Sequence, residues 1–255
     1  MSLALTDRSR ANPYAGVLLV AGAAAWAAVL LRWGDMGAMP GTMGLTLPAF
    51  VGMWTVMMAA MMLPATAPIA GMYARSLPAR RLPRMTAFTT GYLTVWALAG
   101  LPGYELAVAA GWVADDARPV GTAVAAAIFA ANGVYQLSGW KDRCLASCRT
   151  PVGMMLRYVS WHGPTRDLRA GAHHGAFCLG CCWTLMALLA AFGMMNLWGM
   201  IGLTAAVVLE KAAPYGERLA RAFGVASLVL AVGVWWVPAV APGLTGSATH
   251  GAMPM

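Results

Sequence analysis

Sulfur and imidazole side chains recur at helical spacing in one apolar segment of the chain. His174, Cys178, Cys182 and Met186 follow one another every four residues, and Cys181 comes three residues after Cys178. In a helix these intervals place side chains on one face. Thiolates, imidazoles and thioethers suit Cu(I) or Zn(II), whereas carboxylate-preferring ions such as Mg(II) find little to bind. A lone membrane cysteine usually serves close packing, but three within five residues favour metal or redox chemistry.

A second pair of cysteines precedes this segment. Cys144 and Cys148 have the i, i+4 spacing of a helix face. If the preceding helix continues through them, both thiols share a row with Trp140, Gln136 and Asn132. We expect all five cysteines of the chain to converge near the cytoplasmic surface. That compartment is reducing, which favours thiolate ligands over a structural disulfide, although the same cluster could exchange disulfides.

Methionine is abundant, with 19 residues in the chain. Around position 57 the spacing gives one helical row of Met53, Met57 and Met61 and a second of Met58 and Met62. Such a stripe commonly serves only as core packing. Because thioethers also bind Cu(I), Met57, Met58, Met61 and Met62 are candidate ligands.

Other methionines and a histidine cluster in segments expected on the opposite, outer side of a membrane. Thioethers bind Cu(I) without losing a proton, so an outer methionine zone and an inner cysteine zone would form a path from weak to strong ligands. The outer clusters are Met36, Met39 and Met43; Met194, Met195 and Met200; and His250, Met253 and Met255.

The elements that position these residues are expected to be membrane-spanning helices. Of the 255 residues 60% are hydrophobic and 10% charged, whereas soluble domains carry about 25% charged residues. We predict an all-α polytopic bundle, forming one membrane domain over residues 1–255. The first segment, which follows Arg8 and Arg10, is interpreted as a retained anchor because it is long for a signal peptide. The predicted spans, about seven, are 14–33, 47–73, 86–110, 120–140, 173–194, 196–212 and 219–240. The fifth and sixth could instead form one re-entrant element.

The distribution of basic residues predicts an orientation with the N-terminus inside and the C-terminus outside. With this orientation only Arg32 and Arg118 of the 17 basic residues lie outside. The long connection at about 141–172 is then cytoplasmic, and its apolar run is short enough to predict a helix along the inner surface. Because the net charge of +8 is spread between hydrophobic runs, it indicates topology and argues against nucleic acid as a partner. We expect a bacterial-type inner membrane, with the lipid bilayer as the surrounding partner.

Two charged residues end the sixth predicted span. Glu210 and Lys211 are expected at the inner surface, where they could pair with each other or steer a partner.

Several of these motifs occur together in one known family. The chain resembles the predicted metal-binding integral membrane proteins, a family also labelled copper chaperones, over roughly residues 45–213. The resemblance implies that the second to sixth helices form the functional core. It rests on Trp54 with Met57 to Pro64, Gly133 to Ser138, Lys141 to Cys144, Cys148-Arg149, Cys178 to Trp183, and Glu210-Lys211.

The leading hypothesis is soft-metal handling without catalysis. The ion, with Cu(I) favoured and zinc as an alternative, would enter at outer methionines and be held or delivered at inner thiols. No Walker-type phosphate loop occurs in the sequence, so transport would be passive or driven by a partner, such as a metal donor or acceptor protein. The alternatives are a membrane thiol oxidoreductase built on the five cysteines and an assembly subunit of a larger membrane complex.

Overall fold

The fold consists of helices and the turns that join them. A computed structural model describes residues 13–36, 41–77, 81–115, 118–149 and 151–245, and within these ranges there is no strand. The all-α prediction is therefore confirmed. The helices are α1 Pro13–Met36, α2 Leu47–Ser76, α3 Arg81–Asp115, α4 Arg118–Gln136, α5 Gly139–Arg149, α6 Pro151–Ser160, α7 Arg166–Phe192, α8 Leu197–Ala212, α9 Gly216–Gly233, the 3₁₀ turn η2 Pro238–Val240, and α10 Pro242–Thr245.

Helices occupy all seven predicted ranges, but fewer have the length and composition of a membrane span. In the described ranges α1, α2, α3 and α7 are long and apolar enough to cross a bilayer, and the bent pair α4–α5 makes a fifth if it counts as one span. Helix α8 has only 16 residues, and α9 begins with the charged residues Glu217, Arg218 and Arg221. Four or five spans are thus supported, and the count of seven stays a prediction.

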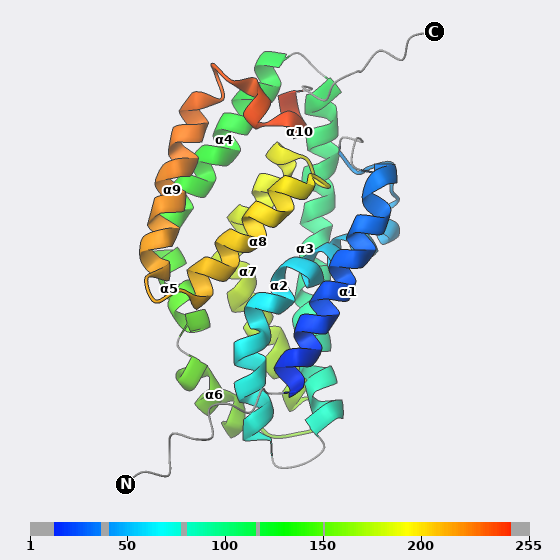
Figure 1. Cartoon of the computed structure of the whole chain (residues 1–255), viewed down its shortest axis with the longest axis vertical. Coiled ribbons are helices and arrows are strands. Elements are labelled where there is room, and N and C mark those ends of the chain that lie inside the picture. The colour runs from blue at the N-terminus through cyan, green and yellow to red at the C-terminus, as the bar shows by residue number, and fades with distance from the viewer. Residues whose placement is uncertain (1–12, 37–40, 78–80, 116–117, 150, 246–255) are drawn as a thin grey trace.

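Consecutive long helices run in alternate directions along the long axis of the molecule (Figure 1). The fifth and sixth predicted ranges contain two helices, α7 and α8, which run in opposite directions (Figure 1). Two spans and one re-entrant element both stay predictions. Gly193 ends α7 with φ 100°, a conformation that favours glycine. Asn196 then begins α8, where its side-chain oxygen accepts a hydrogen bond from the Gly199 N–H at 2.9 Å.

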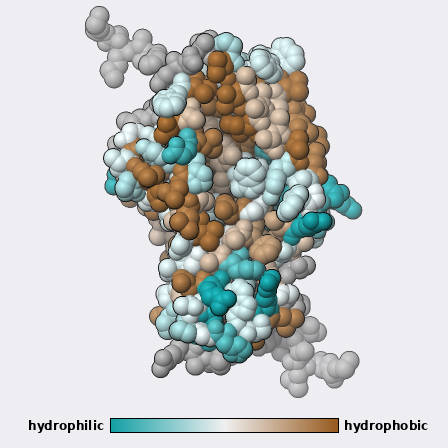
Figure 2. Space-filling model, turned by 180° about the vertical axis from the view of Figure 1, so that it is seen from behind, coloured by the Kyte–Doolittle hydropathy of each residue, from teal (hydrophilic) through white to brown (hydrophobic). Residues whose placement is uncertain are grey.

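The surface divides into an apolar body and a more polar end. Figure 2 shows hydrophobic residues over much of the upper part and hydrophilic residues gathered toward the lower end, where α6 and the first turns of α3 and α7 lie (Figure 1). The long connection contains two short helices, α5 and α6, where the sequence predicted a single surface helix. Its ten-residue α6 is too short to span a bilayer.

Helix α2 changes direction within its length (Figure 1). Pro64 and Pro68 lie inside it, and each lacks the N–H that would continue the helical hydrogen-bond ladder. The part of α2 that precedes Pro64 carries the methionine rows into the core, where Met57, Met58, Met61 and Met62 are fully buried.

Helices α3 and α7 pack closely together, and glycine makes this contact possible. A Cβ atom added to Gly171 of α7 would overlap the backbone of Phe88, and one added to Gly91 of α3 would overlap the backbone of Leu168. Small residues at a helix interface let the backbones approach closely. This contact fixes α7, which carries three cysteines, against α3.

We predict that Gly171→Ala destabilises the protein by about 1–3 kcal/mol, because the added methyl group meets backbone that cannot move aside. Thermal unfolding in detergent, followed by circular dichroism, measures the change. Gly16→Ala is the matched control, since a Cβ at Gly16 in α1 has no neighbour within 4 Å. Equal stability of the two variants would show that α3 and α7 can separate enough to accommodate the added methyl group.

Candidate functional site

The predicted row on α7 forms one buried face. His174, Cys178, Cys182 and Met186 are each at most 3% exposed, and Cys181 is 1% exposed. Helix α7 begins at Arg166 rather than near residue 173, so Cys178 lies about 18 Å along the helix from its start. The thiols therefore lie near the middle of the helix, at the level where α5 and the end of α8 contact it.

Two polar groups from neighbouring helices converge on Cys178. The Lys211 ammonium of α8 donates a hydrogen bond to its Sγ at 2.9 Å, and the Tyr92 hydroxyl of α3 shares a hydrogen bond with the same sulfur at 3.0 Å. Cys178 is fully buried. Its sulfur is thus the point at which α3, α7 and α8 meet through side chains.

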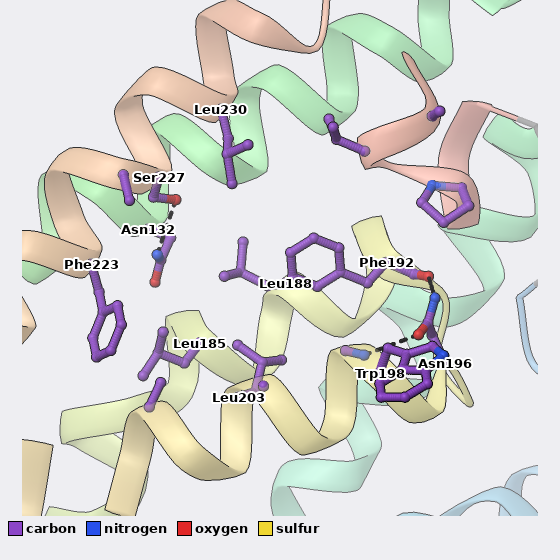
Figure 3. Close-up of a pocket in the computed structure, with 17 residues that line it drawn as sticks. Asn132, Leu185, Leu188, Phe192, Asn196, Trp198, Leu203, Phe223, Ser227 and Leu230 are labelled. Atoms are coloured by element: carbon purple, nitrogen blue, oxygen red, sulfur yellow. Dashed lines mark hydrogen bonds between the residues drawn. The ribbon is translucent and has the colours of Figure 1, made fainter. Parts of the chain in front are cut away.

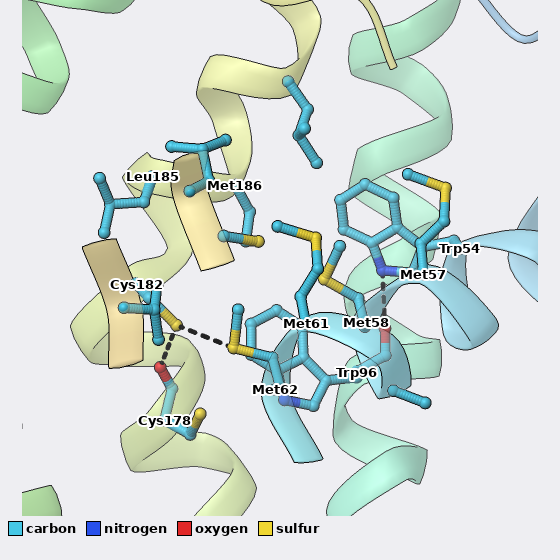
Figure 4. Packing of buried hydrophobic residues seen from close by; sticks show 14 of the residues in the cluster. Trp54, Met57, Met58, Met61, Met62, Trp96, Cys178, Cys182, Leu185 and Met186 are labelled. Carbon is cyan, nitrogen blue, oxygen red and sulfur yellow. Dashed lines mark hydrogen bonds between the residues drawn. The ribbon is translucent and has the colours of Figure 1, made fainter. Parts of the chain in front are cut away.

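The other two cysteines of α7 face sulfur atoms from other helices. The Sγ of Cys181 is 3.9 Å from the Sγ of Cys148 on α5. The Sγ of Cys182 is 3.9 Å from the Sδ of Met62 on α2, a contact drawn as a dashed line in Figure 4. We call Cys148, Cys178, Cys181 and Cys182 the thiol cluster; all four are free thiols in the described structure.

Cys144 is the least buried of the five cysteines. It is only half-buried and lies beside Gly180, where an added Cβ would be 3.1 Å from its sulfur. The continuous row through Trp140 was wrong because α4 and α5 meet at a break with a bend of 63°. Gln136 is buried, whereas Trp140 is 70% exposed.

The methionines of α2 extend the sulfur-rich region beyond Met62. Met57, Met58 and Met61 are buried beside it, and Met186 of α7 faces them (Figure 4). We call Met57, Met58, Met61, Met62 and Met186 the methionine cluster. Met186 also lines a cavity of about 510 Å³ together with Trp54, Trp96 and Met194. Met186 is therefore the member of the methionine cluster that lines this cavity.

The outer methionines are only partly within the described structure. Met43, Met194, Met195 and Met200 are each at most 4% exposed, so they belong to the buried core of the protein. The side chain of Met36 and the residues Met39, His250, Met253 and Met255 lie outside the described part.

His174 is held between two aromatic rings. It stacks on Phe88 and Tyr92 with centroid distances of 6.1 and 5.8 Å, and its buried Nδ1 has no hydrogen-bond partner among the residues that the structure describes. Among the described residues, no group of three or more His, Cys, Asp or Glu side chains is arranged to hold one metal ion. Each sulfur contact described above joins two side chains. Of the partners outside α7, Cys148 and Met62 contribute sulfur atoms. Tyr92 and Lys211 contribute an oxygen and a nitrogen atom.

A comparison with family models decides the family. The model of a family described as copper chaperone matches residues 51–234. This chain belongs to the copper chaperone family. The matched range contains every residue of the thiol and methionine clusters, and it extends beyond the 45–213 range of the sequence resemblance at its C-terminal end. No curated protein and no solved structure matches the chain.

This copper chaperone family member also has a buried ion pair that the sequence did not predict. Lys141 of α5 and Glu210 of α8 are almost fully buried and lie 2.6 Å apart. Gln136 donates to the same carboxylate at 2.9 Å, and Lys141 also donates to the Cys181 carbonyl oxygen at 2.5 Å. Glu210 therefore pairs with Lys141 and not with Lys211. The sequence did contain a signal for this pair, because ionisable residues such as Lys141 and Glu210 are rare in apolar helices and usually have a partner there.

A second large pocket lies on the other side of α7, between α4, α8 and α9. Its volume is about 470 Å³, and its lining includes Leu185, Phe192 and Leu230 (Figure 3). Asn132 donates to Ser227 at one end. None of its lining residues in the described part of the chain is a cysteine or a methionine, so it does not extend the sulfur-rich region.

Breaking the Lys141–Glu210 pair should strongly destabilise the protein, because either residue alone would leave a buried charge without a partner. We predict that Lys141→Met or Glu210→Gln lowers the free energy of unfolding by about 3–5 kcal/mol, and that Lys141→Met combined with Glu210→Leu recovers much of the loss. Denaturation in detergent measures these changes.

The matched control is the exposed pair Arg221 and Asp142, whose atoms are 3.6 Å apart. Arg221→Gln should cost at most about 1 kcal/mol. If the single variants at Lys141 and Glu210 lower the free energy of unfolding no more than Arg221→Gln does, the buried pair does not hold α5 and α8 together.

Proposed function

We propose that this protein binds copper as Cu(I) and passes it from the methionine cluster to the thiol cluster. The observation that carries the proposal is the contact between Cys182 Sγ and Met62 Sδ at 3.9 Å. It joins the methionines of α2 to the thiols of α7 through a buried contact. Copper is the cargo, and this chain's sulfur atoms are the successive donors.

The order of donors follows from their chemistry. A thioether is a neutral donor that needs no deprotonation, whereas a thiol must lose its proton before it holds a metal as thiolate. An ion moving from Met62 to Cys182 therefore moves from a weaker to a stronger ligand. The methionine cluster is the loading side, and the thiol cluster is the holding side.

The holding position is assigned to Cys148 and Cys181. A zinc–thiolate bond is about 2.3 Å long, so two sulfurs sharing an ion of similar size lie at most about 4.6 Å apart. The separation of 3.9 Å between Cys148 and Cys181 falls within this limit. Two sulfurs from different helices, α5 and α7, can thus clamp one ion with small side-chain adjustments.

The same sulfur pair favours one alternative, a membrane thiol oxidoreductase. Cys148 and Cys181 are close enough to form a disulfide by rotation of their side chains. In that case two thiols would lose two protons and two electrons to an oxidant, and copper would be incidental. Thiol trapping in cells distinguishes the two functions. Only the oxidoreductase requires Cys148 and Cys181 to alternate between free thiols and a disulfide.

The transfer direction rests on a proposed membrane topology. We propose seven spans, α1, α2, α3, α4, α7, α8 and α9, with the N-terminus inside and the C-terminus outside in a bacterial-type inner membrane. The alternating helix directions in Figure 1 and the positions of the basic residues support this arrangement. A copper donor outside and an acceptor protein inside would then be the partners, with the lipid bilayer around the helices.

Copper binding tests the assignment of the holding position. We predict that the full chain, purified in detergent and loaded with Cu(I), retains at least one copper ion. Cys181→Ser and Cys148→Ser should each weaken this binding at least about tenfold, because each removes one of the two clamping sulfurs. Cys144→Ser is the matched control and should bind copper as the unchanged chain does. Equal copper in all four proteins would exclude the proposed holding position.

The loading role of the methionine cluster has a separate test. Met62→Leu keeps the volume and removes the sulfur that contacts Cys182. It should slow copper uptake from a weak Cu(I) complex on the order of tenfold while leaving the final copper content unchanged. Met53→Leu, on the same helix but only half-buried, serves as control. Identical uptake rates for the two variants would remove Met62 from the route.

A reporter fused after residue 255 tests the topology. A reporter that is active only outside the cytoplasm should be active in this fusion, and one fused in the 141–172 connection should be inactive. Cytoplasmic location of the first fusion would reverse the proposed direction.

A further inference from the structure

A single lysine provides the positive charge nearest to the thiol cluster. Lys211 Nζ lies 2.9 Å from Cys178 Sγ, and Cys178 lies within about one helical turn of Cys181 and Cys182 on α7. In the part of the chain that the structure describes, no carboxylate forms an ion pair with Lys211. Its charge is therefore available to balance negative charge on the thiols.

The other charged groups around the cluster are already balanced or face elsewhere. Lys141 and Glu210 form a buried pair that contributes no net charge. The Arg149 guanidinium binds the carbonyl oxygens of Glu210 and Pro214 toward the surface. Asp167, near the start of α7, is paired with Arg84. Among these groups, Lys211 carries the positive charge that contacts a thiol of the cluster directly.

We propose that Lys211 makes the thiol cluster select monovalent soft cations over divalent ones. This inference rests on the proposed function and adds to it the charge of the metal ion that the thiols prefer. Two thiols that bind one ion release their two protons to water and carry two negative charges. With Cu(I) the site keeps one negative charge, which the Lys211 ammonium balances. With Zn(II) the two thiolates are already neutralised, and the charge of Lys211 is left uncompensated.

Burial makes this difference in charge matter. The cysteines of the cluster are at most 4% exposed, and a net charge in such a site is costly because little water solvates it. The sulfur donors alone would accept Zn(II) as well as Cu(I). Donor type and charge together therefore restrict the cargo to soft monovalent ions, a class that includes Cu(I) and Ag(I).

The experiment compares one monovalent and one divalent ion that undergo no redox change. Apparent dissociation constants for Ag(I) and Zn(II) are measured separately, with chelator-buffered metal and the full chain in detergent. Lys211→Gln should reduce the preference for Ag(I) over Zn(II) on the order of tenfold or more, the scale of a like-charge contact, chiefly through tighter Zn(II) binding. A loss of fold would weaken the binding of both ions. It would therefore not produce the tighter Zn(II) binding that the inference predicts.

Two control variants separate charge from other effects. Lys211→Arg keeps the charge and should keep the preference, whereas Arg221→Gln removes an equal charge from the exposed pair with Asp142 and should leave it unchanged. A preference in Lys211→Gln within about twofold of the unchanged chain would overturn the inference and leave the proposed function standing. An unchanged chain that bound neither ion at its thiols would overturn both.

Discussion

The arrangement of the sulfur atoms depends on how a buried lysine is satisfied. Lys141 has no access to water, and its ammonium is held by the Glu210 carboxylate of α8 and the Cys181 carbonyl oxygen of α7. An unpaired charge at this position would cost several kcal/mol. The three helices α5, α7 and α8 must therefore meet here, and by meeting they bring Cys148 of α5 against Cys181 of α7. The ion pair contributes little net stability compared with well-packed apolar residues, but it specifies which helix faces come together.

The sulfur-rich core combines rigid and adaptable parts. The methionines of α2 are unbranched and polarisable, so they fill space between helices while retaining several rotamers. The cysteines have short side chains on helices held by the Lys141–Glu210 pair and by the α3–α7 contact. Flexible thioethers thus lie next to thiols whose positions are fixed. This arrangement suits the proposed function, in which the methionines accept an ion in several geometries and the thiols then hold it in a single geometry.

The sequence predicted the local periodicities well and the contacts between distant segments poorly. The row of His174, Cys178, Cys182 and Met186 was found because a single helix determines it. The long apolar helices were located because lipid requires continuous apolar runs, although α7 begins seven residues before its predicted range. The contact between Cys182 and Met62 joins residues 120 positions apart, and no periodicity indicates such a pair. The bend between α4 and α5 was likewise missed, since no proline marks it. The contact between Lys211 and Cys178 was not predicted, because the two residues lie on different helices.

The glycine contact between α3 and α7 has a mechanical consequence. Backbones that touch without intervening side chains cannot slide or separate by small steps, so these two helices act as one stationary wall. An ion entering the thiol cluster needs room that this wall cannot give. The displacement must come from the opposite side, where α5 is a short helix set off by a bend and α8 contacts the sulfur atoms through the long side chain of a lysine. Room for the proposed copper ion would therefore come from the side of α5 and α8, away from the α3–α7 contact.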